Sequence, residues 1–224
     1  IIIFIVMLSL SLFIAKDVGN GFFLMALLYL ILQILYSFIF KAIEIFDIFF
    51  IAVGYILRVL AGELITGYHL SVWLLLTTIS LSMFLAIGKR RSELTLLKSY
   101  TGVRAAEIRQ SLSHYSEQLL TAFIVIFATS TFIFYSLFTF LENPQGVRLS
   151  LDFFLPDVLP YYLQRKWLMV TIIPVVFGLM RYLQDIYEKQ EGESPDRVLL
   201  SDKSLLASVI IWGLLVVFII YFIG

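Results

Sequence analysis

Long uninterrupted apolar stretches dominate this sequence and restrict the folds that it can adopt. Several are close to the roughly 20 residues that an α-helix needs to cross the hydrocarbon core of a membrane. Because lipid satisfies no backbone polar group, and because the alternating pattern of barrel strands is absent, these stretches are predicted to be membrane-spanning helices. They cover about residues 1–15, 21–40, 48–66, 70–88, 118–141, 167–183 and 205–223.

We therefore predict an all-α, multi-pass membrane helix bundle that forms one transmembrane domain over residues 1–224. The hydrophobic share of 61% and the charged share of 14% exclude a water-soluble monomer. The first apolar stretch begins at Ile1 without an initiating methionine, without a basic stretch before it and without a small-residue cleavage pattern after it. This favours a chain that lacks its N-terminal part over a signal peptide.

The charged residues are polarised although the formal net charge is +0. A balanced total argues against nucleic-acid binding, and Cys 0 with His 2 leaves no thiolate and too few histidines for a zinc centre. Most basic residues follow the second, fourth and sixth spans, so the positive-inside rule places the connections at about 41–47, 88–118 and 181–204 in the cytoplasm of a plasma-membrane protein. These residues are Lys41, Lys89, Arg90, Arg91, Lys98, Arg104, Arg109, Arg181, Lys189, Arg197 and Lys203, against Lys16, Arg148, Arg165 and Lys166 in the other connections.

Arg58 lies near the middle of the third span, where a cation is unfavourable by about 2.5–3.5 kcal/mol before compensation. At 100° per residue, Gly54, Arg58 and Gly62 share one stripe of the helix, and Asp47 falls on the same stripe almost three turns earlier. The glycines allow another backbone or a ligand to approach the guanidinium. Arg58 is predicted to face a wet or paired interior, either in a binding site or as a bridge between helices.

The fourth span ends in three consecutive cations, Lys89, Arg90 and Arg91, followed by Glu93. Such a run is compatible with side chains that reach the interface and contact anionic lipid. It is also compatible with a phosphate or diphosphate site, because Arg binds two oxygens in a bidentate fork and Lys adds a point charge. Lys41 and the charge-dense segment 181–204 are predicted at the same membrane face, which favours the phosphate site.

Three connecting segments carry weaker signals. Residues 98–118 have the pattern of an amphipathic helix, in which His114 is either a surface residue or a general base. Segment 181–204 is either a lid over a polar ligand or a solvated hairpin. Segment 142–166, rich in aromatic residues and proline, is predicted to be an anchor at the lipid interface.

These residues form an ordered pattern that covers nearly the whole chain. The pattern resembles that of the decaprenyl-phosphate phosphoribosyltransferases, a branch of the UbiA-type intramembrane prenyltransferase superfamily. The resemblance implies nine helices, of which the spans of this chain would be helices three to nine, and a central cavity open to the cytoplasm and to lipid. The matching residues are Tyr36-Ser37 with Lys41, Asp47, Gly54 to Gly62 around Arg58, Gly88 to Leu94, Arg181-Tyr182, Gly192 to Asp196 and Leu199 to Asp202.

The chain departs from the superfamily pattern in three places. The first motif, Asn-Asp-x-x-Asp-x-x-x-Asp, is absent, which agrees with a chain that begins at the third helix. The second aspartate motif is replaced by Lys89, Arg90 and Glu93, which favours phosphoribosyl transfer over prenylation of an aromatic acceptor. The Tyr-x-x-x-Lys motif is present with one extra residue, as Tyr36 and Lys41.

The resemblance implies Mg²⁺-dependent transfer of 5-phosphoribosyl from phosphoribosyl diphosphate to a polyprenyl phosphate in the membrane, with release of diphosphate, as a step of cell wall biosynthesis. Prenyl transfer to an aromatic acceptor, and a membrane transporter or scaffold without catalysis, are the alternatives, and a homo-oligomer is left open. The phosphate or diphosphate clamps would be Lys41, Arg58, Lys89 and Arg90. Substrate binding would add Tyr36, Asp47, Glu93, Arg181, Tyr182 and Asp202, with Glu93 also as a metal ligand.

Overall fold

The computed structural model describes residues 2–67, 69–99, 115–142, 167–189 and 195–223. Their regular structure is entirely helical, with eight α-helices and no strand, so the all-α prediction is confirmed for this part of the chain. The α-helices are α1 (Ile2–Val18), α2 (Asn20–Phe38), α3 (Phe46–Thr66), α4 (Val72–Ser99), α5 (Glu117–Leu141), α6 (Ile172–Gln184), α7 (Pro195–Ser201) and α8 (Lys203–Phe218). Shorter helical segments are η1 (Phe40–Ala42), η4 (Trp167–Thr171), η5 (Asp185–Lys189) and η6 (Ile219–Ile223).

Among the described residues, six helical segments are long and apolar enough to cross a membrane. They coincide with all the predicted spans except the first, whose helix α1 has 17 residues and is shorter than any of the six. The fold therefore agrees with a multi-pass membrane protein. The six segments are Asn20–Phe38, Phe46–Thr66, Val72–Thr95, Glu117–Leu141, Trp167–Glu188 and Lys203–Tyr221.

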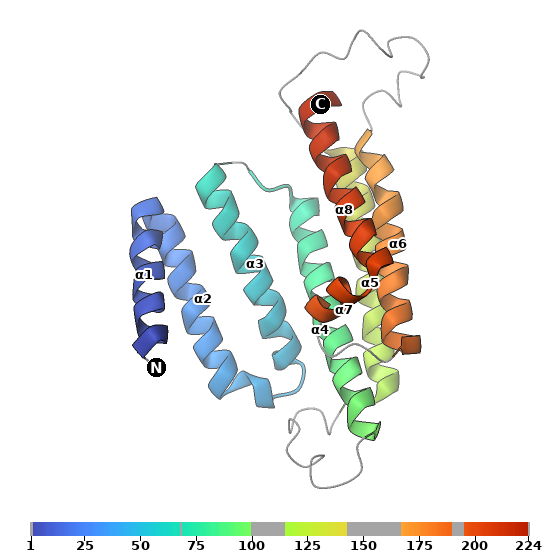
Figure 1. The fold of residues 1–224 in the computed structure, drawn as a ribbon, viewed down its shortest axis with the longest axis horizontal. Coiled ribbons are helices and arrows are strands. Elements are labelled where there is room, and N and C mark those ends of the chain that lie inside the picture. Colours follow the sequence, from blue (N-terminus) through green and yellow to red (C-terminus); the bar gives the residue numbers. More distant parts are fainter. Residues whose placement is uncertain (1, 68, 100–114, 143–166, 190–194, 224) are drawn as a thin grey trace.

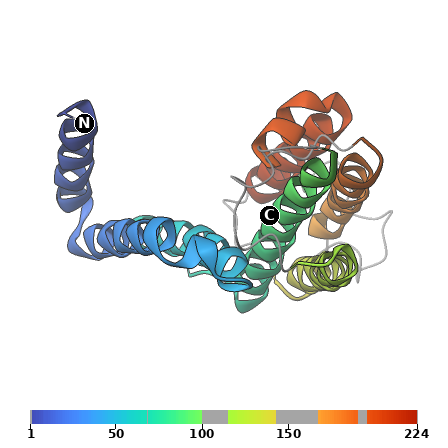
Figure 2. The ribbon, with the colours of Figure 1, turned by 90° about the horizontal axis from the view of Figure 1, so that it is seen from below.

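The long helices form a bundle with a row of helices beside it (Figure 1). Helices α4, α5, α6 and α8 make the bundle, and α3 lies against α4 with α2 and α1 beyond it. Figure 2 shows that this row extends to one side of the bundle. The main core lies inside the bundle, where Phe84, Ile87, Leu120, Ile124 and Leu205 are buried, whereas α2 buries no residue. The bundle and the start of α3 therefore provide the rigid frame for a site.

Local side-chain chemistry sets several helix ends. Gly67, at φ 68°, ends α3 in the left-handed conformation that glycine adopts without a Cβ penalty. Ser116 caps α5 by accepting a hydrogen bond from the Leu119 N–H at 3.1 Å. Asp202 caps α8 with one carboxylate oxygen, which accepts the N–H groups of Ser204 and Leu205 at 2.8 and 2.9 Å. The cap at Asp202 fixes the turn between α7 and α8.

Helix α4 continues past the predicted end of its span at residue 88 and reaches Ser99. The hydroxyls of Ser92 and Thr95 donate to carbonyls one turn earlier, so these polar residues continue the helix without unpaired hydroxyls. Arg90 and Glu93 pair one turn apart at 2.5 Å. The predicted cytoplasmic connection therefore begins as a charged extension of α4 rather than as a loop.

Candidate functional site

The predicted phosphate-binding cations other than Arg58 lie toward one end of the molecule. Helices α2, α4 and α6 all run toward the end at which α3 begins (Figure 1). This end carries Lys41 in η1, Lys89 to Arg91 in α4 and Arg181 near the end of α6. The alternation inferred from the basic residues thus agrees with the direction of the helices.

Arg90 is the centre of a buried charge cluster between α3 and α4. Its side chain and that of Asp47 are both 0% exposed, and Arg90 Nε lies 3.4 Å from Asp47 Oδ2, an ion-pair contact without hydrogen-bond geometry. Arg90 Nη1 donates to Glu93 Oε2 at 2.5 Å. Within the described part of the chain, Arg90 Nη2 is buried and has no hydrogen-bond partner. Three of the predicted site residues therefore come together, with one guanidinium nitrogen available for an anion.

Tyr115, just before α5, completes this cluster from a third element. Its hydroxyl donates to Asp47 Oδ1 at 2.9 Å and accepts the Ile45 N–H at 2.5 Å. Burial, followed by the nearby Asp47 carboxylate, raises the pKa of Tyr115, so the phenol stays protonated and able to donate at neutral pH. Nothing in the local sequence marks Tyr115, because its partner Asp47 lies 68 residues earlier and only tertiary structure joins them.

Gly88 lets the end of α6 approach α4 immediately before the cluster. A Cβ at this position would lie 2.9 Å from the Tyr182 hydroxyl and 2.9 Å from Ile186 Cδ1. The Tyr182 ring is buried and packs against Phe84, with the ring centroids 5.3 Å apart. Tyr182, predicted to bind substrate, is therefore held against Gly88 by a close helix contact, on the face of α4 opposite to Arg90.

The other two cations of the α4 run point to different surroundings. Lys89 is half-buried and lies one turn before Glu93. Arg91 stacks on the ring of Tyr187 in η5, with Cζ 3.7 Å from the ring centroid, and donates to the hydroxyl of Thr121 on α5. Arg91 therefore holds α4, α5 and η5 together, and Lys89 and Arg90 are left as the candidate anion-binding pair.

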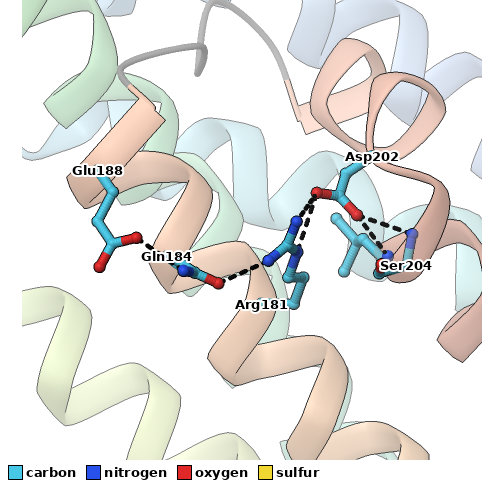
Figure 3. A network of polar contacts seen from close by, with 6 residues as sticks. Arg181, Gln184, Glu188, Asp202 and Ser204 are labelled. Atoms are coloured by element: carbon cyan, nitrogen blue, oxygen red, sulfur yellow. Dashed lines mark hydrogen bonds and ion pairs between the residues drawn. The ribbon is translucent and has the colours of Figure 1, made fainter.

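Arg181 and Asp202 form a second polar network, shown in Figure 3. Arg181 donates from Nε and Nη2 to Asp202 Oδ2 at 2.9 and 2.6 Å. Its Nη1 donates to Gln184 Oε1 at 2.7 Å, and Gln184 donates in turn to Glu188 at 2.7 Å. Because Asp202 also caps α8, the network joins the end of α6 to the start of α8. The structure thus brings Arg181 and Asp202 together, as an ion pair between helices.

Arg58 does not join either network. Its guanidinium donates to the Tyr29 hydroxyl on α2 and lies 4.9 Å from the Tyr29 ring centroid and 5.3 Å from that of Tyr55. Arg58 is exposed rather than enclosed, and eleven residues, or about 16 Å of helix rise, separate it from Asp47. Asp47 turns to α4 and Arg58 to α2, so the shared stripe predicted for them does not produce a shared cluster.

The structure describes only some of the remaining predicted residues. Lys41 is exposed in η1, and Tyr36 is half-buried in the last turns of α2. The predicted amphipathic segment after α4, with His114, and the predicted interfacial belt lie outside the described residues, apart from their ends. The same holds for residues 190–194 of the predicted lid, whereas the rest of that segment forms the end of α6, η5, α7 and the start of α8.

An apolar cavity of about 490 Å³ lies between α4, α5, α6 and α8. Phe84 and Tyr182 line it near Gly88, and no residue of the Arg90 charge cluster is among the residues that line it. Tyr135 and Trp212 also line it, and the indole N–H of Trp212 donates to the Tyr135 hydroxyl at 2.7 Å. The Tyr135 hydroxyl also lies 2.6 Å from that of Thr171. The cavity is therefore suited to an apolar chain, with a small polar group at its Tyr135 side.

The magnesium requirement stays a prediction for this chain. The described residues contain no group of three or more His, Asp or Glu side chains that could hold a metal ion. The carboxylate of Glu93, the predicted ligand, is already paired with a cation, because it lies 2.5 Å from the Arg90 guanidinium. No chemical step is therefore assigned to a metal here.

The fold and the site define the class of the protein: a multi-pass helical membrane protein with a buried polar cluster toward one end and a separate apolar cavity inside the helix bundle. No family model matches the sequence. Individual relatives do match, and they carry one name, decaprenyl-phosphate phosphoribosyltransferase. The chain is a homologue of these enzymes, as the motif resemblance predicted.

The similarity extends over most of this chain but over only part of its relatives. The Corynebacterium glutamicum protein is 31% identical over 193 residues, which are 86% of this chain and 52% of the relative. The Mycolicibacterium smegmatis protein is 31% identical over 184 residues, 82% of this chain and 54% of the relative. The Mycobacterium tuberculosis protein is 29% identical over 189 residues, which are 84% of this chain and 55% of the relative. The chain thus spans about half the length of these curated relatives.

Proposed function

We propose that the complete protein transfers 5-phosphoribosyl from phosphoribosyl diphosphate to a polyprenyl phosphate in the membrane and releases diphosphate. The observation that carries this proposal is the similarity, over 82–86% of the chain, to relatives named decaprenyl-phosphate phosphoribosyltransferase. The buried Arg90 cluster and the apolar cavity inside the bundle support the same pairing of a phosphate group with a lipid chain.

The proposed reaction requires little acid–base catalysis by the protein. An oxygen of the lipid phosphate attacks the anomeric carbon, the bond from that carbon to the diphosphate breaks, and the diphosphate leaves with the electron pair. The attacking phosphate is already ionised at neutral pH, so no general base is required. The protein has to place the two phosphate-bearing substrates and stabilise the charge of the leaving diphosphate.

The proposed roles follow from position. Lys89 and Arg90 would bind phosphate or diphosphate oxygens, with Arg90 oriented by Asp47 and Glu93. Lys41, at the same end, would add a further cation. The cavity would take the part of the isoprenoid chain nearest the lipid phosphate. We place this end of the molecule in the cytoplasm, as the distribution of basic residues indicates.

Transfer can be measured in membranes that contain the complete protein, with labelled phosphoribosyl diphosphate and a polyprenyl phosphate, by extraction of the labelled lipid. We expect Lys89→Ala and Lys41→Ala to abolish the lipid product without loss of the folded protein, because neither side chain is fully buried. Lys16→Ala is the matched control, because Lys16 is an exposed lysine in the last turn of α1, away from the Arg90 cluster. Retained turnover in both test variants would remove the site assignment.

The same assay separates the alternatives. Product from a labelled aromatic acceptor and a prenyl diphosphate, with none from phosphoribosyl diphosphate, would assign the protein to aromatic prenylation. Absence of diphosphate release with either substrate pair would favour a transporter or scaffold. The Mg²⁺ requirement implied by the resemblance is a separate prediction, and chelation with EDTA followed by restoration of Mg²⁺ tests it.

A further inference from the structure

We propose that Tyr115 is a positioning residue of this site: its hydroxyl orients the Asp47 carboxylate and, through it, the phosphate-binding guanidinium of Arg90. This inference rests on the proposed function, and the contacts that support it are those of the Arg90 cluster. Tyr115 contacts no reacting group in the proposal. It acts on Arg90 indirectly, through the Asp47 carboxylate of α3.

The direction of each hydrogen bond follows from what the partners can do. The Ile45 N–H can only donate, so the Tyr115 oxygen accepts from it at 2.5 Å. The phenol proton is then directed to Asp47 Oδ1, at 2.9 Å. Asp47 Oδ1 also accepts the Ile48 N–H at 2.8 Å. With Oδ1 held by two donors, Oδ2 faces Arg90.

The backbone beside Tyr115 is held in an unusual conformation. Ile45 is β-branched and has φ 64°, and the Phe46 N–H bonds to the Glu44 carbonyl at 2.6 Å across it, which makes a tight γ-turn at the start of α3. A branched residue adopts positive φ only when its surroundings impose it. The bond from the Ile45 N–H to Tyr115 is one such constraint, so one hydroxyl fixes both the turn and the carboxylate two residues later.

The consequence for Arg90 is a guanidinium held on two sides. Nη1 donates to Glu93 and Nε faces Asp47, while Nη2 has no partner among the described residues. A phosphate oxygen is the acceptor that suits a buried, charged N–H donor. If Tyr115 no longer donates, Asp47 can rotate toward Arg90 and take up the donor that the phosphate would use. We expect weaker binding of diphosphate-bearing ligands, without a change in which bond is made.

The test compares Tyr115→Phe, Asp47→Asn and the double variant in the complete protein. Phe keeps the buried ring and removes only the hydroxyl. One readout is the KM for phosphoribosyl diphosphate, and the other is the thermal stabilisation of the detergent-solubilised protein by inorganic diphosphate. Tyr221→Phe is the control, because Tyr221 is an exposed tyrosine of η6 at the other end of α8.

We expect Tyr115→Phe to raise KM about tenfold and to reduce the diphosphate shift, the effect of losing one hydrogen bond to a charged group. If Tyr115 acts through Asp47, the double variant should match Asp47→Asn alone, whereas a purely structural role would make the two effects multiply. A wild-type KM and a wild-type diphosphate shift in Tyr115→Phe would overturn the proposal, as would multiplying effects. Should the Phe variant not be recovered folded, a wild-type KM in Asp47→Asn would overturn it from the other side of the same bond.

The two readouts keep this inference apart from the proposed function. A protein that shows no phosphoribosyl transfer, but whose diphosphate shift depends on Tyr115, would refute the transfer reaction and support the positioning role. A protein with transfer but with no dependence on Tyr115 would do the reverse. Absence of both transfer and a diphosphate shift in the wild type would refute both.

Discussion

Replacing Gly88 with alanine tests the contact on which the placement of Tyr182 depends. A Cβ at residue 88 would lie 2.9 Å from the Tyr182 hydroxyl, 2.9 Å from Ile186 Cδ1 and 3.1 Å from Tyr182 Cε1. Real Cβ atoms do not approach other atoms to 2.9 Å, so something must move. Ile186 can change its terminal rotamer, but the Tyr182 ring is buried against Phe84 and has little room to turn.

The expected cost is the difference between two opposing terms. Inserting a methyl group into a packed interface costs about 1–3 kcal/mol through displaced side chains and backbone. Alanine in place of glycine within a helix contributes about 1 kcal/mol in the opposite direction through helix propensity. The net loss of unfolding free energy for Gly88→Ala is therefore about 0–2 kcal/mol. The overpacking term itself is isolated only by comparison with a glycine that has space around it.

Gly62 in α3 is that matched control, because nothing lies within 4 Å of a Cβ built there. Gly62→Ala should raise the unfolding free energy by about 1 kcal/mol. Unfolding of both variants in mixed detergent micelles, followed by helical circular dichroism, gives the two values under one condition. We expect Gly88→Ala to be less stable than Gly62→Ala by about 1–3 kcal/mol. Equal stability of the two variants would mean that α6 does not approach α4 at Gly88.

Two further substitutions test local features of the frame by the same unfolding measurement. Asp202→Ala removes both the N-cap of α8 and the partner of Arg181, whereas Asp202→Asn loses the charge but keeps a capping oxygen; the alanine variant should therefore be less stable than the asparagine variant by about 1 kcal/mol, and equal losses would contradict the cap. Ile45→Gly should gain up to about 1 kcal/mol by relieving the positive φ, and Ile45→Ala, which keeps a Cβ, should not; a gain with alanine would contradict the strain.

The positions of the spans are largely predictable from sequence because the requirement for continuous apolar surface is local. The predicted stretches from 21–40 to 205–223 all coincide with helices of the structure. The end of α4 is less predictable, since Arg90 and Glu93 look like the onset of a loop. They remain helical because they pair with each other and because Arg90 also contacts Asp47 in the interior, and the sequence alone does not indicate a partner on another helix.

The site is predictable in its residue types and only partly in its geometry. Motif spacing selects Asp47, Arg90 and Glu93, which the structure brings together. Asp47 and Arg58 share a stripe of α3, but they do not form one site. Helix α3 has neighbours on two sides, and Asp47 contacts α4 whereas Arg58 contacts α2. Tyr115 is beyond motif reasoning, since its role depends on a contact 68 residues away in sequence.

The pairing of the arginines changes how an anion can be held at this end of the molecule. Arg90 lies between Asp47 and Glu93, and Arg181 contacts Asp202, so the positive charge of each guanidinium is already partly compensated. Attraction from accumulated positive charge is then weaker than the run of cations suggests. Affinity for a diphosphate has to come from short, directed hydrogen bonds to donors that are held in place. In such a site the carboxylates do not compete with the ligand; they keep the guanidinium in the orientation that the ligand requires, which is why a tyrosine that fixes one carboxylate can matter to binding.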